Sequence, residues 1–156
     1  KGITGGYLPL SAVLTTEKVF AAFYDDSVAR GFLHSHSYTG NTLACRAALA
    51  VLDIFADDSV ITRNREQTTR ISQALEPVAQ HASVKHFRNC GMIWAFEANT
   101  HQTDFANRCF QLALQNGVLL RPIGNTVYLM PPYILDQQQI HLLAHTTLTI
   151  VDQLGD

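Results

Sequence analysis

The sequence has few charged residues and no run of charge of one sign. Eleven lysines and arginines stand against thirteen aspartates and glutamates, which gives a formal net charge of −2 at pH 7. Proteins that bind nucleic acids usually carry a basic patch or stripe. Only 15% of the residues are charged and 47% are hydrophobic, so the chain can form a packed core and lacks the composition of a disordered segment. We therefore expect a folded protein that binds no nucleic acid.

Cysteines are few as well, and their spacing matches no common cysteine motif. Cys45, Cys90 and Cys109 lie far apart in apolar stretches, which favours buried thiols in a reducing compartment over disulfides or a metal site. His141 and His145 lie one helical turn apart, but no carboxylate or third ligand accompanies them. We interpret them as histidines on a helix surface and predict no metal site.

Long apolar runs are absent too. No run approaches the roughly 20 residues needed to cross a bilayer, and no signal-peptide pattern precedes the predicted fold. We therefore expect a cytoplasmic protein without a membrane span. The first residue is Lys1 and not methionine, so we expect that a segment upstream of it is missing.

The first 81 residues are predicted to form loops, one short strand and helices. Glycines between positions 2 and 6 indicate a loop, and the apolar run 8–14 predicts a short buried strand. Thr16 is the predicted N-cap of a helix that continues through Phe23. The segment 42–55 is apolar on nearly every side, which predicts a buried helix. A more polar helix is predicted over 60–79, with a buried stripe of Ile71, Leu75 and Val78.

The remaining residues, 82–156, are predicted to form a small α+β domain. Asn116-Gly117 is typical of a helix end, Pro131-Pro132 ends a strand, and Asp136 is the predicted cap of the last helix. The strands are predicted at 84–87, 92–97, 118–120 and 126–130, and the helices at 103–116 and 136–153. This order, ββ-α-ββ-α, is that of a sheet with helices on one face.

Arg121 and Tyr128 are the first candidates for a functional site. Arg121 lies between the apolar segment 118–120 and Pro122, where its planar guanidinium could bind a carboxylate or a phosphate. From position alone, an interdomain salt bridge is the favoured interpretation. Tyr128 could present its hydroxyl to the same pocket, although a tyrosine in a strand is more often part of the core.

A second candidate is the hydroxyl-rich loop that precedes Gly40-Asn41 and the helix over 42–55. Its hydroxyl residues are Ser35, Ser37, Tyr38 and Thr39. These hydroxyls, together with the N–H groups at the helix N-terminus, could bind a phosphate, or the loop could simply cap the helix. Lys1, ahead of a glycine-rich turn, could form a Schiff base if its amine were partly desolvated, but any fragment can begin with a lysine.

Four motifs of the sequence occur in the order found in a single family. They are Lys1-Gly2-Ile3-Thr4-Gly5-Gly6, Leu10-Ser11-Ala12-Val13-Leu14-Thr15-Thr16, Gly40-Asn41 leading into Leu43-Ala44-Cys45, and Arg121-Pro122 with Tyr128-Leu129-Met130-Pro131-Pro132-Tyr133. Together they resemble the class III, fold type I aminotransferases from residue 1 to about 150. The resemblance implies an α/β fold. Residues 1–81 would be the C-terminal part of the large cofactor-binding domain with the interdomain helices, and residues 82–156 the small α+β C-terminal domain.

The resemblance also implies roles for individual residues. Lys1 would form the Schiff base with pyridoxal 5′-phosphate and later move a proton between the substrate carbon and the cofactor. Ser37 stands where the family usually has a threonine that binds the cofactor phosphate across the interface of a homodimer. Arg121 would bind the substrate carboxylate, and Tyr128 and Ser35 would make further substrate contacts.

The loop and the upstream region set this sequence apart from many class III relatives. Where those relatives read His-Gly-Pro-Thr or His-Gly-Ser-Thr, this sequence reads His34-Ser35-His36-Ser37. In the family, the ring-stacking aromatic, the Gly-Ser phosphate turn and the aspartate that pairs with the pyridine nitrogen all precede the lysine. We therefore expect that activity requires the N-terminal half of the same enzyme and that the isolated fragment is inactive.

The motifs at 121–124 and 128–133 are narrower than the lysine motif. The resemblance they carry is to class III members that convert 8-amino-7-oxononanoate to 7,8-diaminononanoate in biotin biosynthesis, with S-adenosylmethionine as the amino donor. Two alternatives stay open. One is a class III aminotransferase for another ω-amino acid or diamine, and the other is a noncatalytic fragment that acts as a binding module.

Overall fold

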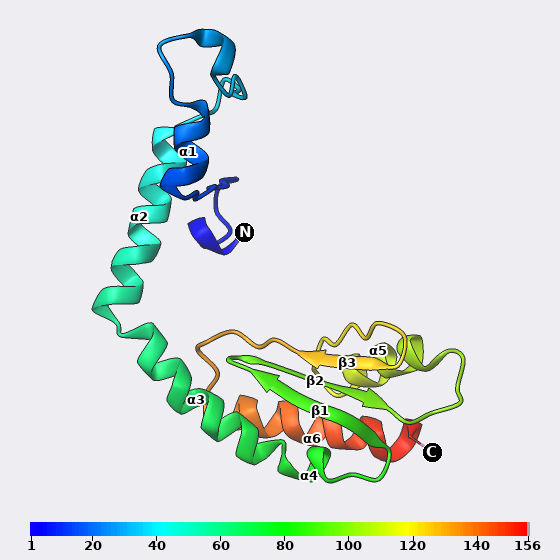
Figure 1. Ribbon diagram of the computed structural model, residues 1–156. Coiled ribbons are helices and arrows are strands. Elements are labelled where there is room, and N and C mark those ends of the chain that lie inside the picture. The colour runs from blue at the N-terminus through cyan, green and yellow to red at the C-terminus, as the bar shows by residue number, and fades with distance from the viewer. Residues whose placement is uncertain (156) are drawn as a thin grey trace. The chain divides into compact units, whose positions relative to one another are not determined.

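The computed structural model describes residues 1–155 and divides into two compact units, Lys1–Val60 and Ile61–Asp156. The described part of the first unit consists of helices, helical turns and loops, whereas the second contains a sheet covered by helices (Figure 1). This division into units is based on contacts between residues of this chain. The domain boundary predicted near residue 82 stays a prediction.

The first unit contains the long helix α2 and three short elements. They are η1 (Gly2–Thr4), α1 (Glu17–Phe23), η2 (Val28–Arg30) and α2 (Thr42–Asp57). At the start of α1, the Thr16 hydroxyl accepts a hydrogen bond from the N–H of Val19, and at the start of α2 the Asn41 side-chain oxygen accepts one from Ala44. Such caps satisfy N–H groups that the first helical turn leaves unpaired. The two helices predicted in this region are confirmed.

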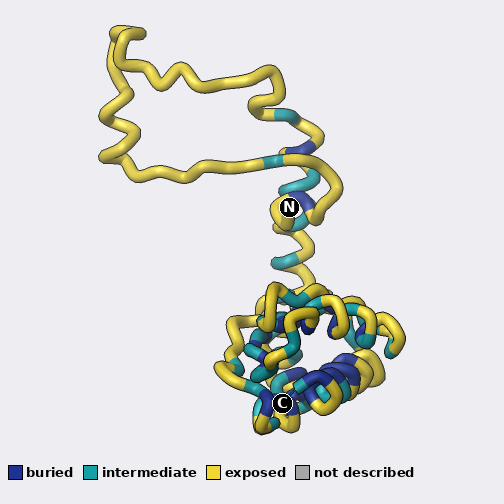
Figure 2. The backbone as a smooth tube through the Cα atoms, turned by 90° about the vertical axis from the view of Figure 1, so that its right-hand side faces the viewer, coloured by how far each residue is buried: buried dark blue, intermediate teal, exposed yellow. Residues whose placement is uncertain are grey.

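Two predictions for the first unit are wrong. The run 8–14 forms no strand, and its residues are mostly exposed. A strand requires a hydrogen-bonded partner, and no strand within residues 1–155 pairs with this run. The apolar helix α2 is not buried, because the unit contains no sheet to cover it: Leu43 and Leu52 are 72% and 64% exposed. Exposed residues dominate the first unit in Figure 2, whereas buried residues gather in the second.

The second unit contains a three-stranded antiparallel sheet with the order β1-β2-β3. Its strands are β1 (Val84–Cys90), β2 (Ile93–Ala98) and β3 (Thr126–Leu129), and its helices are α3 (Val60–Ala74), α4 (Glu76–Ala79), α5 (Phe105–Gln115) and α6 (Gln137–Leu154). Alternate residues of β2 and β3 are buried in the core with residues of α5 and α6: Trp94, Phe96, Val127 and Leu129. This alternation is typical of an antiparallel sheet with one covered face.

Pro77 divides the helix predicted over 60–79 into α3 and α4. A proline inside a helix removes one backbone N–H, and its ring clashes with the carbonyl four residues earlier. Leu75 separates the two helices, and Pro77 lies in the first turn of α4. The buried stripe predicted for this region is confirmed, since all three of its residues are fully buried.

The pair of strands predicted after α5 is reduced to one. The segment 118–120 forms no strand, because the N–H of Val118 donates to the Ala113 carbonyl at the end of α5 and no strand within residues 1–155 pairs with the segment. The observed order is therefore ββ-α-β-α. The first hairpin is confirmed, with its turn at Gly91, where φ is 56°. The last helix, α6, is confirmed with its predicted cap at Asp136.

Candidate functional site

Arg121 and Tyr128 line the same cleft in the second unit. The cleft has a volume of about 490 Å³, and apolar residues make up most of its lining. It is bounded by residues 117–121 after α5, by the end of β3 with residues 130–132, and by Leu135 and residues of α6. The structure thus brings together two residues that are predicted to bind substrate, although it leaves their roles as predictions.

The local fold explains why these two side chains reach the cleft. Leu120 is buried, and the chain then emerges so that the next residue, Arg121, is exposed. In β3, the two neighbours of Tyr128 are buried, whereas Tyr128 is half-buried. Among residues 1–155, no carboxylate forms an ion pair with Arg121. The guanidinium is therefore available within this unit to bind an anionic ligand.

Lys1 and the loop before α2 line a second cleft, which lies in the first unit. This open cleft has a volume of about 1030 Å³ and is also lined by residues 6–11. The loop is held by hydrogen bonds within it: the N–H of His36 donates to the Thr39 hydroxyl at 3.2 Å, and the N–H of Tyr38 donates to His36 Nδ1 at 3.3 Å. Ser35 and Ser37 are exposed and lie outside the lining of this cleft.

Two features of the clefts were not predicted from the sequence. His36 lines the Lys1 cleft, and Gln139 lines the Arg121 cleft from the first turn of α6. The departure of the loop from the family motif marked His36 as unusual. The sequence around Gln139 indicated only a capping role, because the other residues of the cleft come from distant parts of the chain.

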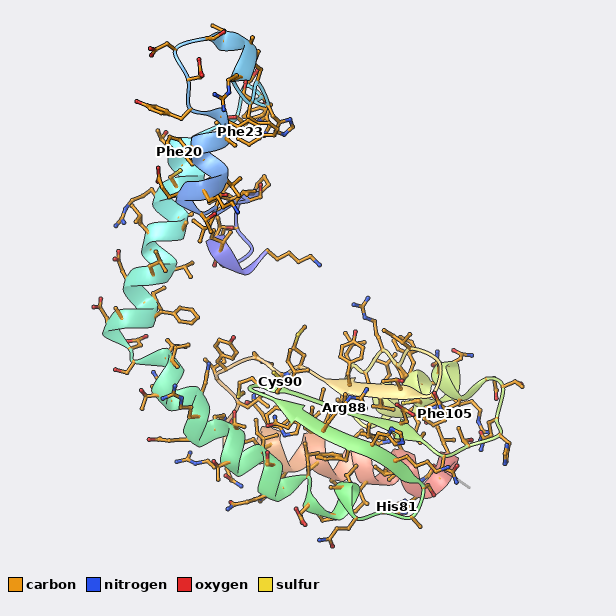
Figure 3. All side chains as sticks on the ribbon, viewed as in Figure 1. Phe20, Phe23, His81, Arg88, Cys90 and Phe105 are labelled. Carbon is orange, nitrogen blue, oxygen red and sulfur yellow. The ribbon has the colours of Figure 1, made fainter. Side chains whose placement is uncertain are left out.

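The prediction of three buried thiols is correct for one cysteine only. Cys45 and Cys90 are exposed, the latter at the end of β1 (Figure 3). Cys109 is fully buried on the core side of α5, and this burial raises its pKa to about 12, since the charged thiolate would lose its hydration. The prediction for Cys45 failed because its helix, α2, is apolar but is not covered by other elements of this unit.

The histidines of α6 lie on the helix surface, as predicted. His141 and His145 are both exposed, and His141 Nε2 lies 2.8 Å from the side-chain nitrogen of Gln137. Within the described chain, no group of three histidine, cysteine or acidic side chains is placed to hold a metal ion. None of the helices over residues 1–155 combines the length and the apolar character that a membrane span requires.

Comparison with known proteins identifies the family. The model of the family "Aminotransferase class-III" matches residues 1–151, and the chain belongs to the class III aminotransferases. It is 41% identical to the adenosylmethionine-8-amino-7-oxononanoate aminotransferase of Helicobacter pylori and 35% identical to that of Synechococcus elongatus. Each of these alignments covers 99% of this chain and 37% of the relative. The chain thus spans about 37% of the length of these curated relatives.

Solved structures agree with this assignment. The adenosylmethionine-8-amino-7-oxononanoate aminotransferase of Methanocaldococcus jannaschii matches with a TM-score of 0.89 at 30% identity, over 99% of this chain and 37% of that one. An amine transaminase from an uncultivated Pseudomonas species, solved in its PLP-bound internal aldimine form, matches with a TM-score of 0.85 at 29% identity, over the same shares of the two chains. The fold type I architecture predicted from the sequence is confirmed.

Proposed function

We propose that this chain forms the C-terminal part of an enzyme that transfers an amino group from S-adenosylmethionine to 8-amino-7-oxononanoate and yields 7,8-diaminononanoate. The cofactor would be pyridoxal 5′-phosphate and the enzyme a cytoplasmic homodimer. The main observation that supports this substrate is the cleft that Arg121 and Tyr128 both line. The relatives at 41% and 35% identity, which bear the name of this activity, support the same reaction.

The Arg121 cleft fits one end of this substrate. A guanidinium binds a carboxylate through two parallel hydrogen bonds. The walls around Arg121 are mostly apolar, including Leu119, Met130 and Leu142, and such walls favour an aliphatic chain behind the carboxylate over a second charged group. Tyr128 is half-buried and can donate its hydroxyl proton to an oxygen of the substrate. Together, these side chains would orient a long-chain carboxylate.

The residues of the first unit fit the cofactor. Lys1 is exposed on an open cleft, so its amine can be reached by a carbonyl compound. Pyridoxal 5′-phosphate, when bound, supplies an electron sink for the substrate carbon. Lys1 would hold the cofactor and, once released, would move the proton between that carbon and the cofactor. Ser37 is exposed and outside the Lys1 cleft, which supports the proposal that its hydroxyl binds the phosphate in the partner subunit of a homodimer; Ser35, exposed beside it, would contact substrate there.

The test uses the complete enzyme that contains these residues. After reduction with borohydride, mass spectrometry of peptides should find the phosphopyridoxyl group on Lys1, and the Lys1→Ala variant should carry none. In a separate assay without borohydride, the wild type should form 7,8-diaminononanoate from 8-amino-7-oxononanoate and S-adenosylmethionine. If Lys1 is labelled but the enzyme turns over a different ω-amino acid or diamine, the proposed substrate is wrong. If Lys1 is not labelled, the proposed enzyme assignment is wrong.

A further inference from the structure

The segment that joins β3 to α6 forms one wall of the Arg121 cleft. Four of its residues line the cleft: Met130, Pro131, Pro132 and Leu135. Within residues 1–155, no backbone–backbone hydrogen bond outside the helices and strands involves residues 130–135. The two prolines have no N–H to donate. The position of this wall therefore depends on contacts with side chains.

Gln67 of α3 makes such a contact. Its side-chain N–H donates a 2.6 Å hydrogen bond to the carbonyl oxygen of Leu135, which lies 68 residues further along the chain. Gln67 is half-buried, so the bond is partly shielded from competing water. The adjacent Thr68 hydroxyl donates to the Asn64 carbonyl of its own helix at 2.8 Å and lies 3.3 Å from the carbonyl oxygen of Gly91, so the same turn of α3 lies against the β1–β2 hairpin. Gln67 is thus presented by a helix that is itself attached to the sheet.

The residue after Leu135 is fixed as well. The N–H of Asp136 donates to Gln139 Oε1 at 2.9 Å, and the N–H of Gln139 donates to Asp136 Oδ1 at 2.8 Å, which completes the capping box of α6. Because β3 ends at Leu129 and α6 begins at Gln137, the bond from Gln67 lies in the connection between them, at the residue whose side chain packs against the core.

We propose that Gln67 is a positioning residue for substrate: it holds the Leu135 carbonyl and so fixes the apolar wall that contacts the aliphatic chain while Arg121 binds the carboxylate. This inference rests on the proposed function of the same cleft. Without the donor, the wall samples more conformations, and a ligand must order it on binding, which lowers affinity. The chemistry at Lys1 involves no atom of this wall, so kcat is unchanged.

The matched pair of variants is Gln67→Met and Gln73→Met in the holoenzyme. Both remove a glutamine from α3, but the Gln73 side chain is exposed and makes no hydrogen bond within residues 1–155. For Gln67→Met, the KM for 8-amino-7-oxononanoate should rise about two- to tenfold, which corresponds to one net hydrogen bond. The KM for the amino donor and kcat should not change. Gln67→Lys retains an N–H donor and should restore most of the affinity.

Hydrogen exchange and a binding probe separate this inference from the proposed function. Amide exchange at Asp136 and Gln139, whose N–H groups are hydrogen-bonded next to Leu135, should be faster in Gln67→Met than in Gln73→Met. Nonanoate, which has the chain and the carboxylate but no reacting group, should bind Gln67→Met more weakly than the wild type even if the wild type transaminates no oxo acid. Equal nonanoate affinity and equal exchange in the two variants would overturn the role of Gln67, as would an equal rise of both KM values.

Discussion

His81, which lies just before β1 (Figure 3), has its Nε2 3.0 Å from Asp152 Oδ1 near the end of α6. The N–H of Ser83 donates to His81 Nδ1 at 3.1 Å. Since Nδ1 accepts this bond, the proton of the imidazole lies on Nε2 and can be donated to the carboxylate of Asp152. The contact therefore connects the C-terminal helix to the first strand of the sheet.

Removing the acceptor should weaken this connection. We expect Asp152→Ala to lower the free energy of unfolding by about 0.5–1 kcal/mol, the usual contribution of a partly exposed hydrogen-bonded pair. Asp152→Asn should lower it less, because the amide oxygen still accepts from Nε2. Urea unfolding of the chain measures both. Asp53→Ala, which removes an exposed 3.4 Å pair with Arg46, is the control, and equal effects of Asp152→Ala and Asp152→Asn would contradict the hydrogen bond.

Thr146→Val should stabilise the chain. The Thr146 hydroxyl is buried and, within residues 1–155, has no hydrogen-bond partner, so its burial costs free energy that a methyl group would not. We expect the free energy of unfolding to rise by about 1 kcal/mol. The control is Thr147→Val, because Thr147 is equally buried but its hydroxyl donates to the Leu143 carbonyl at 2.7 Å. A gain in Thr147→Val as large as in Thr146→Val would argue against this account.

Cys109 should be unreactive while the chain is folded. Its pKa of about 12 leaves it protonated at pH 8, and its sulfur is buried, whereas Cys45 and Cys90 are exposed. Brief treatment with iodoacetamide followed by peptide mass spectrometry should label Cys45 and Cys90 only, and treatment in urea should label all three. Labelling of Cys109 at the same rate as Cys90 without urea would show that α5 is not packed as described.

The same thiol makes stability depend on pH in the alkaline range. The folded chain retains the Cys109 proton up to a pKa of about 12, but in the unfolded chain the thiol has its ordinary pKa near 9.0. Between these values the folded state binds more protons than the unfolded state, so the contribution is complete below about pH 9 and decreases as pH rises toward 12. Cys109→Ala should flatten the stability profile over this range, as measured by urea unfolding at a series of pH values.

On the proposed function, Arg121→Lys should weaken binding of the carboxylate substrate in the complete enzyme. A lysine keeps the charge but loses the planar pair of donors, so we expect the KM for 8-amino-7-oxononanoate to rise about tenfold or more, which corresponds to the loss of one charge-assisted contact. Tyr128→Phe should have a smaller effect. An amine substrate without a carboxylate provides the control, because its KM should not depend on Arg121. An equal rise for both substrates would indicate a structural role.

Several features could be predicted because they depend on neighbours in the chain. Thr16 and Asp136 cap their helices through residues three positions away, and Asn116-Gly117 ends α5 through its own backbone geometry. The family followed from short motifs whose residues are contiguous, such as Lys1 to Gly6. These features hold in any environment that allows a helix or a turn to form.

Apart from the helix break at Pro77, which is local, the failures concern contacts with distant partners. The apolar character of 8–14, 118–120 and α2 indicated that these segments favour burial, but it did not reveal whether a strand or a sheet would cover them. The same holds for the bond from Gln67 to Leu135. Composition and local pattern therefore determined which helices form and which family the chain belongs to. Tertiary structure alone decided which apolar residues are buried and which side chains share the Arg121 cleft, because burial and clefts arise between segments far apart in the sequence.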